Sequence, residues 1–388
     1  MRLRHPDGTV VHLAYCSNVH PAEDPAGIHD QLRRFAGPVR AALGVDRLGL
    51  GLWLPAAAAA RLAGDRAELD ALRAVLDEQG LEVVTLNAFP YGGFHDPVVK
   101  HRVYRPDWTE PERLTYTLQA AEVLAALLPE DAVRGSISTL PLAWHTPWTA
   151  QDAAAARANL AELATGLARL RDRTGRTVRV GFEPEPGCVV ETTSDAVREL
   201  AGVDTDHLGM CVDTCHLATA FEDAEEAMGR VTGAGLPVVK AQLSAALHVA
   251  DPADPAAREV LGDFVEDRFL HQVREPGPDG VAGLDDLPDA LADGALPATS
   301  PWRVHFHLPL HSAPRAPLGS TAAELTASAR ALVGGARPLT DHLEVETYTW
   351  SVLPPDQRPT DDRGLVAGIA AELGFARDQL HSLGLEDA

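Results

Sequence analysis

The sequence is poor in cysteine, in aromatic residues and in positive charge. Its 388 residues include 4 cysteines and 5% aromatic residues, and 33 lysines and arginines stand against 56 aspartates and glutamates. No two cysteines form a Cys-x-x-Cys pair, which argues against a small disulfide-rich module. Most of them lie in or beside apolar strands, as reduced thiols in a cytoplasmic protein do, so we expect a cytoplasmic location.

Long apolar segments are missing as well. The start, MRLRHPDGTVVHLAY, has no apolar core of the length that a signal peptide needs, and no run of about 18 apolar residues occurs, so we expect no insertion into a membrane. The formal net charge of −23 would repel phosphate backbones, which argues against a nucleic-acid partner. A small molecule is the expected partner, and an oligomer is left open.

Apolar segments of strand length alternate with segments of helix length along the whole chain. Helices are expected at residues 30–43, 55–79, 109–128, 149–173, 320–333 and from 364 on, and the strand candidates are VVHLAYC, LGLGLWLP, LEVVTLN, GSISTLPLAW, TVRVGF, HLGMCVD, VVKAQLSAAL, RVHFHLPL and HLEVETYTW. This alternation is typical of βαβ units and a parallel sheet. We therefore predict a (β/α)8 TIM barrel, formed by residues 1–388 as a single domain, with an extra βα unit or an insertion near residues 245–300.

One strand candidate is in excess for an eight-stranded barrel. VVKAQLSAAL and RVHFHLPL both qualify as the seventh strand, and the sequence leaves that choice open. A doubly wound open sheet is the alternative architecture. It is disfavoured because no Gly-x-Gly-x-x-Gly turn follows any strand candidate.

The stretch from residue 177 to residue 216 carries the clearest functional signal. In TVRVGFEPEPG the apolar residues alternate with a set that includes Glu183 and Glu185. In HLGMCVDTCH, Asp213 lies on the face opposite the apolar set, and His216 follows just after the strand. Charge at the end of an apolar strand is costly unless it is paired or binds a cation, and active sites of parallel barrels lie at this carboxyl end.

Three later strand candidates carry similar groups on one face, namely Lys240 and Gln242, His305 and His307, and Glu344 and Glu346. Carboxylates and imidazoles together suit a divalent ion such as Mn²⁺, Mg²⁺, Co²⁺ or Zn²⁺. Which member of the His305/His307 and Glu344/Glu346 pairs points further inward stays open. A buried ion pair of the earlier carboxylates with Arg179 or Lys240 is the alternative to a metal.

Two asparagines and a loop complete the set of candidates. Asn18 and Asn87 follow early strand candidates, where they could hold sugar hydroxyls or satisfy loop backbone. The Gly- and aromatic-rich segment 89–104 is expected to cover the site, as a mobile lid that hinges at Gly92 and Gly93 or as a rigid packed loop.

Several of these segments resemble xylose isomerase-like barrels. GFEPEPG is similar to their metal-ligand strand, CVDTCH to their acid-x-x-His element, and HLEVETYTW to the eighth-strand ending of their sugar epimerases. The ordered set YCSNVHP, LGLGLWLP, LNAFPYGGFH, GSISTLPLAW, EPEPG, VDTCH, KAQLS, VHFHLPL and LEVETYTW is also similar to the EboE group of metabolite traffic proteins.

The resemblance implies a divalent-metal-dependent isomerase or epimerase that acts on a sugar- or cyclitol-like molecule in a metabolite biosynthesis or traffic pathway. It implies that Glu183, Asp213 and Glu346 are metal ligands, and that Glu183 and Glu346 also serve as acid and base. His216 would contact a substrate oxygen or a second metal. His307 is the further expected metal ligand.

We expect the substrate to contact Asn18, Asn87, His216, Lys240, Gln242 and His305. If Gln242 occupies the seventh-strand ligand position that is often a histidine in the family, the metal site would be weakened or lost. A metal-dependent phosphoesterase of the apurinic-endonuclease type and a non-catalytic metabolite-binding barrel are the alternatives.

Overall fold

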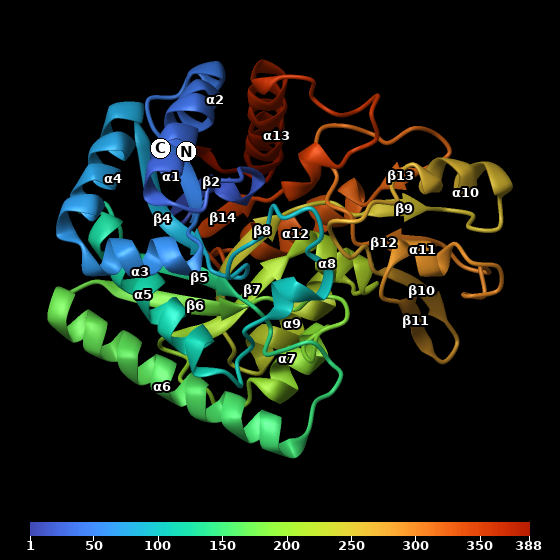
Figure 1. The fold of residues 1–388 in the computed structure, drawn as a ribbon, viewed down its shortest axis with the longest axis horizontal. Helices are drawn as coiled ribbons and strands as arrows, with labels where there is room; N and C mark the ends of the chain where they lie inside the picture. The colour runs from blue at the N-terminus through green and yellow to red at the C-terminus, as the bar shows by residue number, and fades with distance from the viewer.

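Eight parallel strands close into a barrel in the computed structural model, which describes all 388 residues. In barrel order they are β2 (Val10–Cys16), β3 (Leu48–Trp53), β4 (Leu81–Asn87), β5 (Arg134–Thr139), β6 (Thr177–Phe182), β7 (Leu208–Asp213), β8 (Val238–Leu243) and β14 (His342–Val345). The parallel pairing of β14 with β2 closes the ring. The predicted (β/α)8 barrel is therefore confirmed (Figure 1).

Helices surround this barrel (Figure 1). They are α1 (Pro25–Gln31), a π-helical turn at Leu32–Ala36, α2 (Gly37–Leu43), α3 (Ala56–Gly64), α4 (Arg66–Gln79), α5 (Pro111–Leu127), α6 (Ala150–Thr174), α7 (Thr193–Glu199), α8 (Thr214–Thr219), α9 (Ala224–Gly233), α12 (Ala322–Val333) and α13 (Asp362–Ser382). The single helix predicted over residues 55–79 is wrong, because the chain breaks at Asp65. This residue is extended, with φ −125°, and its carboxylate caps α4 by accepting from the Ala67 N–H at 2.9 Å.

A second, antiparallel sheet decides which candidate is the seventh barrel strand. VVKAQL forms β8, between β7 and β14, whereas β12 (Trp302–Val304), from the candidate RVHFHLPL, pairs with β9 (Leu247–Val249) and β10 (Val273–Gly277). Two further strands complete this sheet, β11 (Gly280–Leu284) and β13 (Gly319–Ser320). RVHFHLPL is therefore not a barrel strand.

The insertion that carries this sheet is longer than predicted. It spans residues 247–320, because β13 returns to pair with β9, and it includes α10 (Pro255–Gly262) and α11 (Leu287–Ala290). It has its own apolar cluster around Phe264, Trp302 and Phe306 and projects to one side of the barrel (Figure 1). Whether it belongs to a single domain of residues 1–388 stays a prediction.

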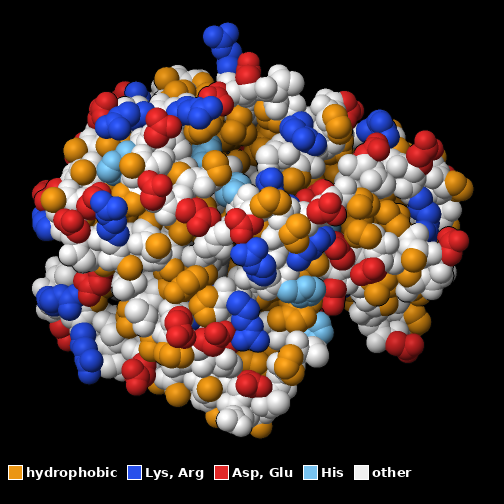
Figure 2. Space-filling view, in the orientation of Figure 1, with side chains coloured by type: hydrophobic (Ala, Val, Ile, Leu, Met, Phe, Trp, Pro, Cys, Tyr) orange, Lys and Arg blue, Asp and Glu red, His pale blue; other side chains and the backbone are white.

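Figure 2 shows acidic and basic side chains interspersed with apolar ones on one face. No helix combines the length and the apolar character that crossing a bilayer requires. The two termini lie side by side, because β1 (Arg2–Arg4) pairs with both β2 and β15 (Glu386–Asp387).

Charged side chains fill the middle of the barrel, below the mouth. The Lys240 ammonium donates to the Glu344 carboxylate, and both side chains are fully buried. Gly51 makes room for this pair, because a Cβ at that position would lie 1.5 Å from Glu344 Oε1. Glu344 is thus the deeper member of its pair, engaged by a lysine.

Glu372 of α13 ties three segments around the mouth together. Its buried carboxylate accepts hydrogen bonds from the Leu310 N–H at 3.0 Å, the Thr347 hydroxyl at 2.7 Å and the Trp350 indole at 3.0 Å. Leu310 follows the histidines of the insertion, and Thr347 follows Glu346. One side chain therefore holds α13, the returning insertion and the end of β14 in place.

We expect Glu372→Ala to lower the free energy of unfolding by about 3 kcal/mol, because it leaves three donors without an acceptor. Urea unfolding followed by circular dichroism measures the change. Asp378→Ala, at an exposed position of the same helix, is the control and should change stability by less than about 0.5 kcal/mol. Equal effects of the two substitutions would contradict this role.

Candidate functional site

Three carboxylates meet at the carboxyl end of the barrel. Glu183 directly follows β6, Asp213 ends β7 and Glu346 directly follows β14. One oxygen of each lies within 4.8 Å of the other two, and all three side chains are buried. The alternation predicted an inward position for each of these residues at the end of its strand, and the barrel brings the three together.

The electrostatics of this cluster are unfavourable without a counter-charge. Burial raises the pKa of Glu183 well above its usual range, and the neighbouring carboxylates Glu346 and Asp213 raise it further. Burial and Asp213 act on Glu346 in the same way. Burial also opposes ionisation of Asp213, but its pKa is lowered, and hydrogen bonds from the Ser244 hydroxyl and the His216 N–H favour its charged form. A divalent cation at this point would remove the repulsion.

Three amides hold the carboxylates in place. Gln242 Nε2 donates to Glu183 Oε1 at 2.6 Å and also to Glu346 Oε2. Asn18 and Asn87 donate to Glu346 Oε1 at 2.7 and 2.9 Å. Asn87 also accepts from the Phe89 N–H at 2.9 Å, so it fixes the loop backbone as well. The inward residue of the seventh strand is therefore an amide that bridges two carboxylates.

Three imidazoles from two segments present their Nε2 atoms to the same region. The Nδ1 atom of His216 lies 2.9 Å from the Pro184 carbonyl, that of His305 lies 2.7 Å from Gln272 Oε1, and that of His307 lies 2.8 Å from the Glu346 carbonyl. These oxygens only accept, so each Nδ1 carries the proton and each Nε2 keeps a lone pair. Burial lowers the pKa of all three, that of His307 to about 4, so the rings are neutral.

The unused donor atoms fit a cation. Glu183 Oε2, Asp213 Oδ2 and His307 Nε2 are buried and have no hydrogen-bond partner. The Nε2 atoms of His216 and His305 lie 3.0 Å apart with a lone pair on each, an arrangement that needs a proton or a cation between them. Ligating histidines usually donate their other ring nitrogen to a carbonyl or carboxylate, as these do. The residues present therefore suit a divalent metal.

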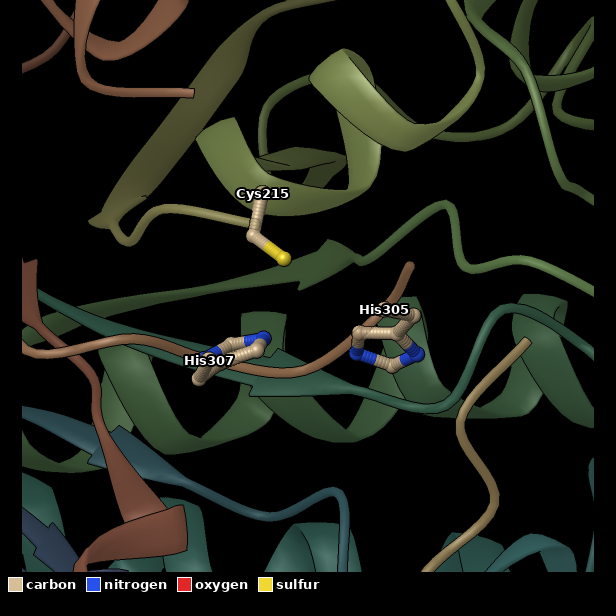
Figure 3. Close-up of side chains that lie close together, drawn as sticks. All are labelled: Cys215, His305 and His307. Carbon is tan, nitrogen blue, oxygen red and sulfur yellow. The ribbon is translucent and has the colours of Figure 1, made fainter. Parts of the chain in front are cut away.

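Cys215 is a neighbour of this site that the sequence did not single out. Its sulfur and a ring nitrogen of each of His305 and His307 lie within 4.8 Å of one another (Figure 3). Burial raises the pKa of this thiol well above its usual range, so without a metal it is neutral. The available signal was its place in CVDTCH, beside both Asp213 and His216.

A pocket opens above the donor atoms. Its empty volume is about 520 Å³, which includes the part open to solvent. The predicted site residues that line it are Asn18, Asn87, Glu183, His216, His305, His307 and Glu346. Asp213, Lys240 and Gln242 lie behind this lining. Lys240 in particular is paired with Glu344 and does not reach the pocket.

Glu185 also lines the pocket, although no role for it was predicted from the sequence. The Tyr104 hydroxyl donates to its Oε1 at 2.7 Å, and Gln272 donates to that hydroxyl at 3.1 Å. Burial raises the pKa of Glu185 to about 8. The signal was its alternation with Glu183 in GFEPEPG, which places both side chains on the inner face.

The predicted cover, residues 89–104, packs on the insertion. The N–H groups of Val99 and Lys100 each donate to the Arg268 carbonyl at 2.8 Å, and Lys100 Nζ pairs with Asp286 at 2.6 Å. Phe89, Phe94 and Tyr104 of this segment form part of the pocket wall. That this cover moves when a ligand binds stays a prediction.

Comparison with known proteins agrees with this architecture. Residues 40–296 match the model of the xylose isomerase-like TIM barrel family. The chain belongs to this family. No curated protein matches the sequence.

Solved structures similar to this family member share its fold. A xylose isomerase-like TIM barrel protein from Mycobacterium smegmatis, in complex with magnesium, is 14% identical, with a TM-score of 0.53 over 96% of this chain and 97% of that one. A protein from Anabaena variabilis assigned as a sugar phosphate isomerase/epimerase is 13% identical, with a TM-score of 0.50 over 97% and 100%. At these identities the likeness concerns the fold alone.

The bridging amide gives a test of the metal site. We expect Gln242→Leu to weaken the affinity for Zn²⁺ or Mn²⁺ about 10- to 100-fold, because the carboxylates lose the group that orients them. Calorimetric titration of the metal-stripped protein measures this affinity. Gln31→Leu, which replaces a buried glutamine outside the site, is the control. An unchanged affinity in Gln242→Leu would show that the cation binds elsewhere.

Proposed function

We propose that this protein is a divalent-metal-dependent isomerase or epimerase that acts on a sugar- or cyclitol-like hydroxy ketone. The observation that carries the proposal is the pair Glu183 and Glu346, which flank the pocket floor beside the unpartnered atoms of Asp213 and His307. Moving a proton next to a carbonyl needs a base within reach of the carbon-bound proton and a second acid–base group.

In this proposal Glu183, Asp213, His307 and Glu346 hold the ion. An ion held by these residues would act as a Lewis acid on the substrate carbonyl and so make the neighbouring carbon-bound proton more acidic. Glu346 removes that proton, since Asn18, Asn87 and Gln242 fix its carboxylate. Glu183 supplies the returning proton, to the same carbon from the opposite face in an epimerisation or to the adjacent carbon in an isomerisation.

Other lining residues would position the substrate. Asn18 Oδ1 is buried without a partner, so it can accept a hydrogen bond from a substrate hydroxyl. His216 and His305 contribute further polar groups to the same wall. The barrel is closed below by the Lys240–Glu344 pair, which keeps the reacting groups at the mouth.

The finer assignment rests on the sequence resemblance. We propose an EboE-type metabolite traffic protein, active in a biosynthetic or traffic pathway and located in the cytoplasm. A metal-dependent phosphoesterase and a non-catalytic binding barrel are the outcomes that the experiment below separates from an isomerase.

We expect Glu346→Gln to reduce proton exchange on the order of 100-fold with little change in substrate affinity, because it keeps the shape of the side chain and removes the base. The assay follows the loss of carbon-bound proton signals by NMR in D₂O, with MgCl₂ or ZnCl₂ and the substrates D-allulose, D-fructose and 2-keto-myo-inositol.

Glu344→Gln is the matched variant two residues away. It leaves Lys240 buried without its partner, so we expect it to lower stability by about 3–5 kcal/mol, while the folded fraction keeps its exchange activity. Full activity in Glu346→Gln, or in metal-stripped wild type, would overturn the mechanism. Hydrolysis of bis(p-nitrophenyl) phosphate instead of exchange would favour the phosphoesterase, and binding without either reaction would favour the binding barrel.

A further inference from the structure

The pocket has two chemically different halves. Its floor carries the carboxylates, asparagines and imidazoles described above, and its upper wall is formed by Phe89, Pro90, Phe94, Val99, Val103, Phe269, Leu270 and Tyr348. The wall combines the cover loop, the insertion and the segment after β14, which are far apart in sequence. We propose that the substrate is an uncharged hydroxy ketone with an apolar substituent, and not a phosphate ester.

The apolar wall begins at the metal-site residue His307. The ring centroids of His307 and Tyr348 are 4.8 Å apart, and Tyr348 lies 5.3 Å from Phe94 and 4.9 Å from Phe269. Phe94 and Phe269 are 5.0 Å apart. A ligand whose oxygens reach the floor therefore has an aromatic surface directly beside it.

The geometry of these rings favours a hydrocarbon over a sugar ring. The interplanar angles among Phe94, Phe269 and Tyr348 are 42°, 66° and 73°, so the rings form a corner of faces and edges and offer no single flat platform. Such a corner can surround an alkyl or aryl group on several sides. Removing that group and the wall from water is favourable in proportion to the apolar area buried.

The charges around the pocket exclude a phosphate. Glu183 and Glu346, which carry negative charge when they hold the ion, line it, and Lys100 is the only lysine or arginine that does. Lys100 Nζ is engaged by Asp286 at 2.6 Å and by the Phe269 carbonyl at 2.7 Å. Turning this ammonium toward a phosphate would leave Asp286 without its partner.

Arg113 and Lys240 are buried near the pocket but do not line it. Arg113 is fully buried and donates to the carbonyls of Ala88, Phe89 and Pro106 at 2.8 to 2.9 Å. Lys240 is paired with Glu344 below the floor. A divalent ion would leave its three carboxylates with net negative charge, so a phosphate dianion finds no free cation among the residues that line the pocket.

The hydroxy ketone part of this inference rests on the proposed function, and the apolar substituent is inferred from the aromatic wall. Its test compares three probes on the Zn²⁺-loaded full-length protein by calorimetric titration. Hydroxyacetone carries only the polar group, 1-hydroxy-4-phenylbutan-2-one adds an apolar arm, and dihydroxyacetone phosphate adds charge. We expect the phenyl ketone to bind at least about ten-fold more tightly than hydroxyacetone, and the phosphate no more tightly than hydroxyacetone.

A variant links the gain to the wall. Phe94→Ala should remove most of the advantage of the phenyl ketone and leave the affinity for hydroxyacetone unchanged. Phe375→Ala, at a partly buried aromatic residue of α13 outside the pocket, should change neither. The comparison of probes on the wild type needs no variant, so it remains decisive if Phe94→Ala does not fold.

The possible results separate a failure of this inference from a failure of the proposed function. Equal affinities for the two uncharged ketones, or tightest binding of dihydroxyacetone phosphate, would overturn the inference while hydroxy ketone recognition, and with it the proposed function, stands. If neither uncharged ketone binds, the proposed function fails and the inference fails with it.

Discussion

Mutual repulsion of three buried carboxylates is the constraint on which the mouth of this barrel depends. Parallel strands end at one edge, so Glu183, Asp213 and Glu346 meet within 4.8 Å. Neighbouring side chains offset this repulsion. Gln242 donates to two of the carboxylates, two asparagines donate to Glu346, and neutral imidazoles keep their lone pairs free. Barrel interiors usually hold branched apolar side chains, so this cluster is what marks the mouth as the candidate site.

The insertion builds the other half of that site. In many barrels a strand supplies each polar group, but here His305 and His307 come from the segment that follows β12 of the antiparallel sheet. Phe269 of the same insertion joins the aromatic wall. Residues 247–320 therefore add donor atoms and apolar surface together. Hydrogen bonds to Glu372 of α13 join the end of this segment to the loop after β14. His307 itself donates to the Glu346 carbonyl, so hydrogen bonds hold this segment in place.

Much of the fold and part of the site could be predicted from local patterns. Strand–helix alternation predicted the barrel, and period two placed Glu183 and Asp213 on the inner face. The alanine-rich run at residues 55–79 predicted one helix, but Asp65 ends α3 and caps α4. Local patterns do not assign a role to Glu185 or Cys215, although GFEPEPG and CVDTCH contain them. Their importance comes from contacts with Tyr104 and with His305 and His307, residues that are distant in sequence.

The sequence by itself determined which residues are polar at the strand ends, because that alternation is a property of neighbouring residues. The tertiary structure decided how deeply each of these side chains is buried and which residue it pairs with. Glu344 and Glu346 share a face, but Glu344 lies within the ladder opposite Gln242 and pairs with Lys240, whereas Glu346 lies beyond the last paired residue, Val345. The seventh strand was likewise set by pairing, since VVKAQL and RVHFHLPL have similar local patterns. Hydrogen bonds between distant strands, which no local pattern encodes, selected the first for the barrel and placed the second above its mouth.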